Sequence, residues 1–194
     1  MFFEDGATYH VYNRSNETLF HNRENYLFFL RKIRKHILPY ADILAYCLMP
    51  NHFHIILVVK AEGVVYSTVK KHEDMQQMAQ AFGTMLSSYT QALNNQTQRR
   101  GNLFAHHTKS RKINGSGNNY GINCFMYVHQ NPLLAGLVER MEDWEYSSFP
   151  DYIGKRSGTL INKQLGLDIF QLEPAQIYFA SYQLLIDKSD EDFL

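Results

Sequence analysis

The sequence predicts an α+β fold, a ferredoxin-like split βαβ domain with an antiparallel sheet and an added C-terminal helix. Three observations support this prediction. Segments with the alternation or apolar runs of strands occur between segments of helical periodicity. Their order is strand, helix, strand, strand, helix, strand, helix. The length of 194 residues and an apolar content of 45% suit one domain with a substantial core.

Each element has its own local signal. The expected strands are rich in β-branched and aromatic residues, and the short turn Met49-Pro50-Asn51 between the second and third predicts a hairpin. These strands cover residues 8–13, 43–48, 52–59 and part of 103–113. The expected helices carry apolar side chains every three or four positions. They cover residues 22–38, 74–93 and 120 to about 130, near Asn131-Pro132. Residues 114–119 form the clearest break between elements.

The net charge is zero, but its distribution is uneven. Residues 1–138 hold 14 basic and 8 acidic side chains, a net charge of +6. Residues 139–194 hold 5 basic and 11 acidic side chains, a net charge of −6. This asymmetry predicts a surface for an anionic partner in the first part of the chain.

The sequence also indicates the compartment. Its longest aliphatic run, Ile55–Val59, is far shorter than the roughly 20 apolar residues of a membrane-spanning helix. The first residues lack the basic start and apolar stretch of a signal peptide. Cys47 and Cys124 lie in apolar surroundings without CxxC spacing, which is typical of buried free thiols. We therefore expect a cytoplasmic protein that does not contact membranes.

The segment His52-Phe53-His54 is the first candidate site. Residues two apart on a strand project from the same face, so His52 and His54 lie side by side and Phe53 enters the core. Two neutral imidazoles in this arrangement can hold one cation. Such pairs also occur on solvated strands without a function. Here the pair begins a strand that is otherwise apolar, which favours a metal site.

The second candidate lies on the last expected helix. Tyr127 and Asn131 are four positions apart and share a helix face. The Asn131 amide oxygen can complete a metal site with the two histidines, which leaves Tyr127 beside the cation. This set suits phosphoryl transfer by covalent catalysis, in which a phenol attacks a phosphodiester beside a divalent cation. A core tyrosine is the simpler interpretation when Tyr127 is considered without the histidines.

Imidazole ligands suit Mn, Zn or Ni better than Mg, which prefers oxygen. A site with two or three protein ligands is completed by water and phosphate oxygen, and cellular Mg or Mn can occupy it. The expected cofactor is therefore Mg or Mn.

Four separated motifs occur in the chain. They are Tyr9–Arg14 (YHVYNR), Leu44–His54 (LAYCLMPNHFH), Tyr127–Val138 (YVHQNPLLAGLV) and Asp143–Ser148 (DWEYSS). In order and spacing they resemble the REP-associated tyrosine transposases, which belong to the HUH superfamily of single-strand endonucleases and are close to the small insertion-sequence transposases. The resemblance covers about residues 7–153. It implies a transposase domain over residues 1–153 and a C-terminal extension of unknown role over residues 154–194.

The resemblance also implies functions for single residues. His52 and His54 match the histidine pair that binds Mg or Mn, and Tyr127 matches the nucleophile that becomes linked to a DNA 5′ phosphate. Asn131 falls where relatives carry an amide near the metal. Relatives recognise hairpins in single-stranded DNA and cut or join beside them. Some act as dimers and others as monomers, so a homodimer is one of two expected states.

A DNA-binding surface follows from charge. Basic residues without an acidic neighbour lie between positions 94 and 116, and Arg14 and the pair Lys70-Lys71 extend them. The candidates are Arg14, Arg99, Arg100, Lys109, Arg111 and Lys112. Relatives carry a Gly-Arg-Phe-Lys-like run at this place, whereas this chain reads AHHTKSR over residues 105–111. A solvated basic loop is the alternative interpretation.

Three functions remain open from the sequence. The first is a transposase-like enzyme that nicks and joins single-stranded DNA through a 5′-phosphotyrosine intermediate. The second is a domesticated descendant that binds hairpin DNA or RNA without cutting. The third is a metal hydrolase that uses His52, His54 and one further histidine: His106, His107 or His129.

Overall fold

A four-stranded antiparallel sheet forms the centre of the computed structural model, which describes residues 1–68, 73–113 and 120–184. The strands are β1 (Thr8–Arg14), β2 (Ala41–Met49), β3 (His52–Val59) and β4 (Lys109–Ile113). Their spatial order is β2-β3-β1-β4, and each neighbouring pair is antiparallel. This order belongs to the ferredoxin-like split βαβ arrangement, so the predicted fold class is confirmed.

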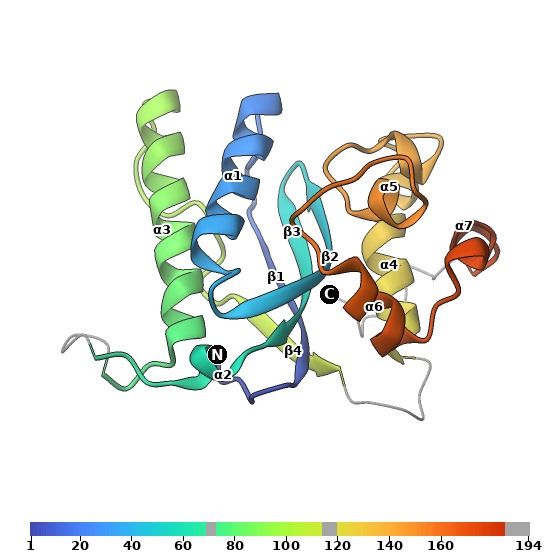
Figure 1. Ribbon diagram of the computed structural model, residues 1–194. Coiled ribbons are helices and arrows are strands. Elements are labelled where there is room, and N and C mark those ends of the chain that lie inside the picture. Colours follow the sequence, from blue (N-terminus) through green and yellow to red (C-terminus); the bar gives the residue numbers. More distant parts are fainter. Residues whose placement is uncertain (69–72, 114–119, 185–194) are drawn as a thin grey trace.

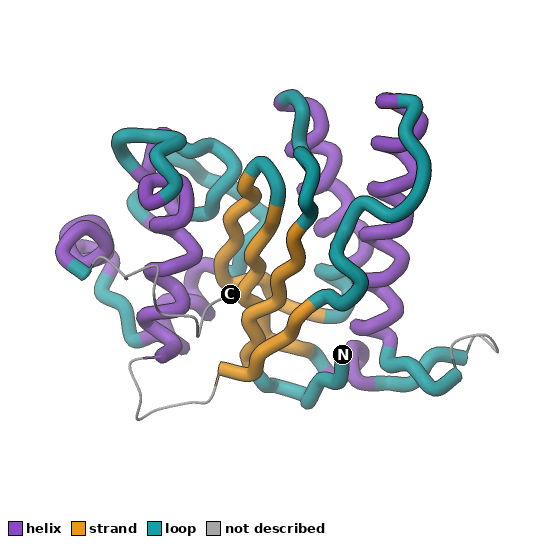
Figure 2. Tube along the Cα trace, turned by 180° about the vertical axis from the view of Figure 1, so that it is seen from behind, coloured by secondary structure: helices purple, strands orange, loops and turns teal. Residues whose placement is uncertain are grey.

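Helices cover both faces of the sheet (Figures 1 and 2). The longer ones are α1 (Arg23–His36), α3 (Gln77–Thr97) and α4 (Tyr120–Leu134). The shorter ones are α2 (Ala61–Val64), the 3₁₀ helix η2 (Met141–Asp143), α5 (Phe149–Tyr152), α6 (Lys163–Phe170) and α7 (Pro174–Gln183). Helices α1 and α3 pack on one face and α4 to α6 on the other, which gives two separate apolar cores.

The two-residue period of the strands distributes side chains between these cores. On β3, Phe53 and Ile55 enter the core below α1 and α3, whereas Ile56 enters the core below α4. On β1, Val11 faces α1 and α3. Its neighbour His10 is fully buried and is paired in register with Ile56. The second face of β1 and β3 therefore carries polar residues below α4, although the remainder of that core is apolar.

The structure changes the bounds of several predicted elements. Helix α4 does not end near Asn131-Pro132 but continues to Leu134, with Pro132 inside the helix. Helix α1 begins after Asn22, whose side chain accepts a hydrogen bond from the Asn25 backbone N–H. Helix α3 begins at Gln77 and continues to Thr97, ending at Gln98 in a left-handed conformation with φ of 54°. The fourth strand starts only at Lys109. Before it, Asn13 Nδ2 donates to Ala105 O (3.2 Å) and Thr108 Oγ1 (2.9 Å), which holds residues 105–108 in a loop.

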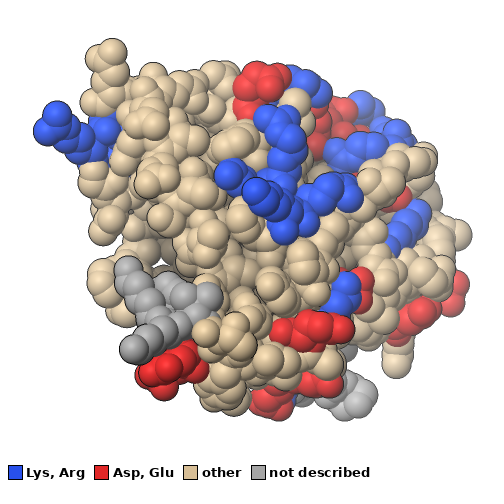
Figure 3. All heavy atoms as spheres, turned by 60° about the vertical axis from the view of Figure 1, so that its left-hand side comes forward, with Lys and Arg blue, Asp and Glu red and all other residues tan. Residues whose placement is uncertain are grey.

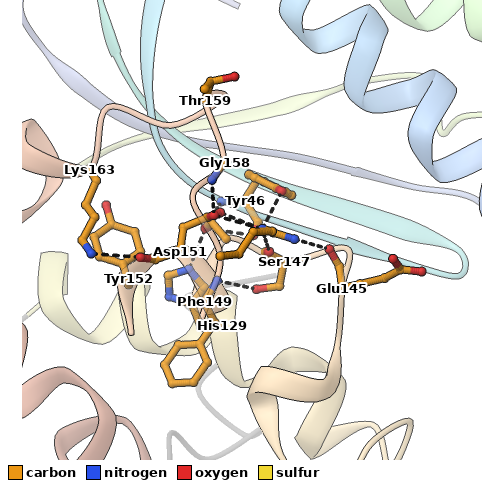
Figure 4. Close-up of polar contacts among 12 residues, drawn as sticks. Tyr46, His129, Glu145, Ser147, Phe149, Asp151, Tyr152, Gly158, Thr159 and Lys163 are labelled. Atoms are coloured by element: carbon orange, nitrogen blue, oxygen red, sulfur yellow. Dashed lines mark hydrogen bonds and ion pairs between the residues drawn. The ribbon is translucent and has the colours of Figure 1, made fainter. Parts of the chain in front are cut away.

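The segment after η2 extends the sheet edge. The Leu48 N–H donates to Tyr146 O and the Ser148 N–H to Tyr46 O, so this segment lies along β2. Figure 4 shows the polar contacts of this segment and of the residues after it, around Asp151. Asp151 accepts hydrogen bonds from the Gly158 N–H (2.7 Å) and from the Arg156 guanidinium (2.9 and 2.7 Å). These contacts fasten the loop before α6 to the body of the domain.

The C-terminal part, from residue 154 to 184, packs against the domain. Its side chains Leu160, Leu167, Phe170 and Ile177 are buried in the two cores, and the Asn162 N–H donates to Ile43 O at 2.7 Å. Lys70-Lys71, the break at 114–119 and the acidic end at 187–192 lie outside the described residues. In the described ranges, no helix is long and apolar enough to cross a membrane.

Candidate active site

The histidine pair lies at the start of β3, on the face below α4. In the β1 register His52 is opposite Arg14 and His54 is opposite Tyr12. The two imidazole rings are 5.0 Å apart and nearly perpendicular. His54 is 1% exposed, and His52 is half-buried at the hairpin turn. The strand therefore presents one imidazole in the interior and one near the surface.

Helix α4 brings Tyr127 and Asn131 to this pair. The Tyr127 ring lies 5.5 Å from the His54 ring in an edge-on orientation. Asn131 Oδ1 is 3.5 Å from His52 Nε2, and Asn131 Nδ2 donates to Tyr127 O at 2.8 Å. All four side chains come from one chain. The structure thus assembles the four residues that the sequence selected for the metal and the nucleophile.

A third histidine, His10 on β1, contacts His54 of the pair. His10 Nε2 and His54 Nδ1 are 2.9 Å apart and share a hydrogen bond. Within the described part of the chain this leaves His54 Nε2 buried without a hydrogen-bond partner. His52 is held similarly, because its Nδ1 lies 2.8 Å from Asn51 Oδ1. His54 Nε2 is thereby available to a ligand, and His52 Nε2 faces Asn131 Oδ1 at 3.5 Å.

Burial keeps these imidazoles neutral. Desolvation lowers the pKa of His10 to about 3 and that of His54 well below its ordinary value. The pKa of His52 is also lowered by burial, against the opposing effect of its hydrogen bond to the Asn131 amide oxygen. Neutral imidazole is the form that binds a cation. Burial raises the pKa of Tyr127 to about 12, with a smaller opposing effect of Asn131, so its phenol carries a proton at neutral pH.

The donor set fits a weakly held divalent cation. Among the described residues, no group of three His, Cys, Asp or Glu side chains is placed to hold a metal, and the polar side chain next to His52 is the Asn131 amide. Two imidazole nitrogens and one amide oxygen leave several positions for water and phosphate oxygen, which suits Mg or Mn. The orphaned His54 Nε2 next to His52 and Asn131 is the observation that favours a ligand here.

Among the described residues, none of the other candidate histidines completes a group of three His, Cys, Asp or Glu side chains that could hold a metal, although His107 lines a cavity beside His52 and His54. His129 is fully buried and its Nε2 is 2.7 Å from Ser148 Oγ, which ties α4 to the segment along β2. His106 and His107 are exposed and lie 3.0 Å apart through their ring nitrogens. A hydrolase site with three histidine ligands therefore gains no support from the geometry.

A cavity of about 420 Å³ opens beside the histidine pair. Its wall includes Arg14, His52, His54, His107 and Lys109. Arg14 and Lys109 are the two predicted DNA-contacting cations at this cavity. Arg111 lies on the same face of the sheet, opposite His10 in register, with its guanidinium 4.7 Å from the centre of the Tyr120 ring. A phosphodiester in the cavity would meet positive charge on the side of β4.

The remaining predicted cations lie elsewhere. Lys112 is on the opposite face of β4, where its Nζ contacts Glu4 at 2.5 Å. Arg99 forms a two-pronged ion pair with Glu17 (2.7 and 2.9 Å), and Arg100 is exposed beyond the end of α3. Figure 3 shows Lys and Arg gathered on the side where α1 lies. Helix α1 contributes Arg31, Lys32, Arg34 and Lys35, on the face of the sheet opposite the histidines.

His10 is the site residue that the sequence did not single out. Its motif was visible, and alternation along Tyr9–Arg14 places His10 and Tyr12 on one face. Its contact with His54 depends on the β1–β3 register, which local periodicity does not give.

No protein-family model matches the chain, and no curated protein matches it. Among solved structures, a REP-associated tyrosine transposase bound to a REP hairpin matches with a TM-score of 0.58 and 16% identity. The match covers 80% of this chain and 84% of that protein. At this identity, the likeness establishes a shared fold.

Proposed function

We propose that the protein nicks and rejoins single-stranded DNA beside hairpins, through a covalent bond between Tyr127 and a DNA 5′ phosphate. One observation carries this proposal. The Tyr127 ring lies 5.5 Å from the His54 ring, and the Tyr127 backbone carbonyl accepts a hydrogen bond from Asn131 Nδ2. Asn131 Oδ1 is in turn 3.5 Å from His52 Nε2. The proposed nucleophile thus lies next to the three proposed cation ligands, two of which, His52 and His54, line a cavity with cationic side chains.

The chemistry follows from these positions. When bound, a Mg or Mn ion held by His52, His54 and Asn131 polarises the phosphate and screens its charge. Tyr127 Oη attacks the phosphorus, so the Oη–P bond forms while the bond from phosphorus to the 3′ oxygen breaks. The phenol proton passes to water, and the leaving 3′ oxygen takes up a proton. Rejoining is the reverse reaction, in which a 3′ hydroxyl attacks the phosphotyrosine and Tyr127 regains its proton.

Two further features support this substrate. Arg14 and Lys109 flank the cavity, where they can contact phosphates. The structural neighbour was solved with a REP hairpin bound, which supports a hairpin as the substrate class. The four site residues belong to a single chain, so the proposed chemistry requires no residue from a second subunit.

The test is a covalent-adduct assay. The protein is incubated with end-labelled, hairpin-bearing single-stranded DNA and Mn, and the products are separated on a denaturing gel. We expect a slow protein–DNA band that disappears with EDTA and in Tyr127→Phe. A band that persists in Tyr127→Phe contradicts the proposal. Tight hairpin binding without any adduct, unchanged by EDTA, would instead indicate a protein that holds folded DNA or RNA without cutting it.

A further inference from the structure

Helix α3 is unusual in carrying no charged side chain along its 21 residues, Gln77–Thr97. Charged residues make up 20% of the chain, so about four are expected in a helix of this length. One face of α3 packs in the core through side chains such as Phe82 and Tyr89. The other face consists of amides, hydroxyls and one glycine.

A groove of about 430 Å³ runs between this face and the loop that precedes β4. Its lining includes Gly83, Ser87, Thr90, Gln91, Asn94, Asn102, Phe104 and His106. A Cβ atom added at Gly83 would meet nothing within 4 Å, so the groove is open at that point. Within the described ranges the side chains of Ser87 and Gln91 make no hydrogen bond, which leaves both side-chain polar groups available to a ligand.

The groove continues into the proposed catalytic cavity. Asn13 and Ala105 line both spaces. The exposed pair His106 and His107 lies between them, because His106 lines the groove and His107 lines the cavity. Their rings are 4.3 Å apart. A chain molecule that leaves the cavity over these imidazoles enters the groove along α3.

We propose that this groove binds the bases of the single-stranded DNA next to the cleaved linkage and so contributes sequence preference. The inference rests on the proposed function for the identity of the polymer. Among the residues that the structure describes, the lining contains no Lys, Arg, Asp or Glu, so it suits a part of the ligand that has no charge. Arg99 approaches through Asn94, but its guanidinium is engaged by Glu17.

Base edges have the matching chemistry. Asn, Gln, Ser and Thr side chains both donate and accept hydrogen bonds, as the edges of unpaired bases do. Imidazole rings provide surfaces on which bases stack. A phosphate backbone, in contrast, requires the cations that this lining lacks. The groove therefore recognises bases while Arg14 and Lys109 contact phosphates at the cavity.

The test combines a protein variant whose groove is filled with a DNA strand whose flank lacks bases. Gly83→Leu fills the groove from a helical position with free space, and Asn95→Leu is the matched control on the exposed part of α3 outside the groove. Two hairpin-bearing single strands are identical except that one has abasic sites in the flank. Dissociation constants are measured in EDTA by fluorescence anisotropy at two salt concentrations.

We expect the wild type and Asn95→Leu to bind the normal flank about ten-fold or more tightly than the abasic flank, at both salt concentrations. Gly83→Leu should lose most of this preference and retain its affinity for the abasic strand. A thermal melt establishes that each variant is folded, and Gln91→Ala should give a smaller loss in the same direction.

The inference is overturned if the wild type does not distinguish the two flanks, or if Gly83→Leu distinguishes them as well as the wild type does. These results are separable from the fate of the proposed function. If the protein prefers the normal flank but forms no Tyr127 adduct, base binding in the groove is supported and the proposed catalysis is contradicted. If it forms the adduct but does not distinguish the flanks, the catalysis is supported and base binding in the groove is contradicted.

Discussion

His10 fixes the orientation of the imidazole that is most deeply buried in the candidate site. Its Nε2 is hydrogen-bonded to His54 Nδ1 at 2.9 Å, and both rings are kept neutral by burial. In the tautomer that carries the proton on His54 Nδ1, the Nε2 lone pair of His54 is free for a cation, in the way that outer-shell partners orient metal ligands. Under the proposed function, His10 would then act as a positioning residue.

Substituting His10 tests this function. His10→Phe should lower the affinity for Mn by about ten- to a hundred-fold, because His54 loses the partner that sets its tautomer. Isothermal titration calorimetry with the folded protein and Mn measures the effect. His10→Gln, which keeps a hydrogen-bonding group, should restore part of the affinity, and the exposed His21→Phe is the control. Equal Mn affinity in the wild type and His10→Phe would contradict a positioning function of His10.

At the scale of elements, a buried carboxylate joins η2 to α7. Glu142 has a side chain that is 2% exposed and accepts hydrogen bonds from Tyr182 Oη (2.7 Å) and Lys155 Nζ (3.0 Å). Burial alone raises the pKa of Glu142, but the hydrogen bonds from Tyr182, the backbone and Lys155 outweigh it and lower the pKa to about 2. Gln130 on α4 also donates to Ser181 O at 2.8 Å, so α7 braces the helix that carries Tyr127.

This carboxylate predicts an acid-dependent loss of stability. A depressed pKa stabilises the fold above the unfolded value of 4.5, and the contribution disappears as the pH falls toward about 2. Between pH 6 and pH 3 the free energy of unfolding should decrease by about 2 kcal/mol more in the wild type than in Glu142→Gln. Urea denaturation at both pH values measures it, with the exposed Glu139→Gln as control. Equal decreases in wild type and Glu142→Gln would contradict the assignment.

The elements also show how far the sequence alone leads. Helix α1 was predictable because its cap, its periodicity and Pro39 are all local signals. The late start of β4 was not, because a long-range contact from Asn13 holds residues 105–108 in a loop. The position of Lys112 was available from the sequence. Alternation along β4 places it on the opposite face from Lys109 and Arg111.

The candidate site was partly predictable for similar reasons. The spacing of His52 and His54 on a strand, and of Tyr127 and Asn131 on a helix, already placed each pair on one face. That the two pairs meet follows from α4 packing on β2 and β3, which only the tertiary structure reveals. The contact of His10 and the groove along α3 depend in the same way on register and packing.

For the whole molecule, ion pairs occupy part of the acidic charge of residues 139–194, mostly with cations of the same segment. In the described part of the acidic segment, four carboxylates are used in ion pairs. They are Glu142 with Lys155, Asp143 with Arg140, Glu145 with Arg23 and Asp151 with Arg156. The cations of α1 lie on the opposite face of the sheet from the cavity. Phosphate binding is thus expected at Arg14 and Lys109, and not wherever the sequence is basic.

The salt dependence of DNA binding tests this distribution. The slope of log affinity against log salt should become less steep by roughly 0.7 for each phosphate contact that is removed from a single strand. Arg14→Gln with Lys109→Gln should therefore reduce the slope by about 1.4. Lys112→Gln, on the opposite face, and a variant with Arg31, Lys32 and Lys35 changed to Gln should leave it unchanged. A less steep slope in the α1 variant alone would contradict this distribution, because it would place the phosphate contacts on the face of the sheet that α1 covers.

Under the proposed function, Tyr127 becomes covalently linked to DNA beside the histidine pair of its own chain. The most direct measurement is peptide mapping of the adduct formed with hairpin-bearing single-stranded DNA and Mn. After digestion with a protease and a nuclease, mass spectrometry should find a nucleotide attached through its 5′ phosphate to the peptide that contains Tyr127, and no such peptide when His52 and His54 are changed to Ala. Attachment at another residue, or cleavage with no attached nucleotide, would contradict the account.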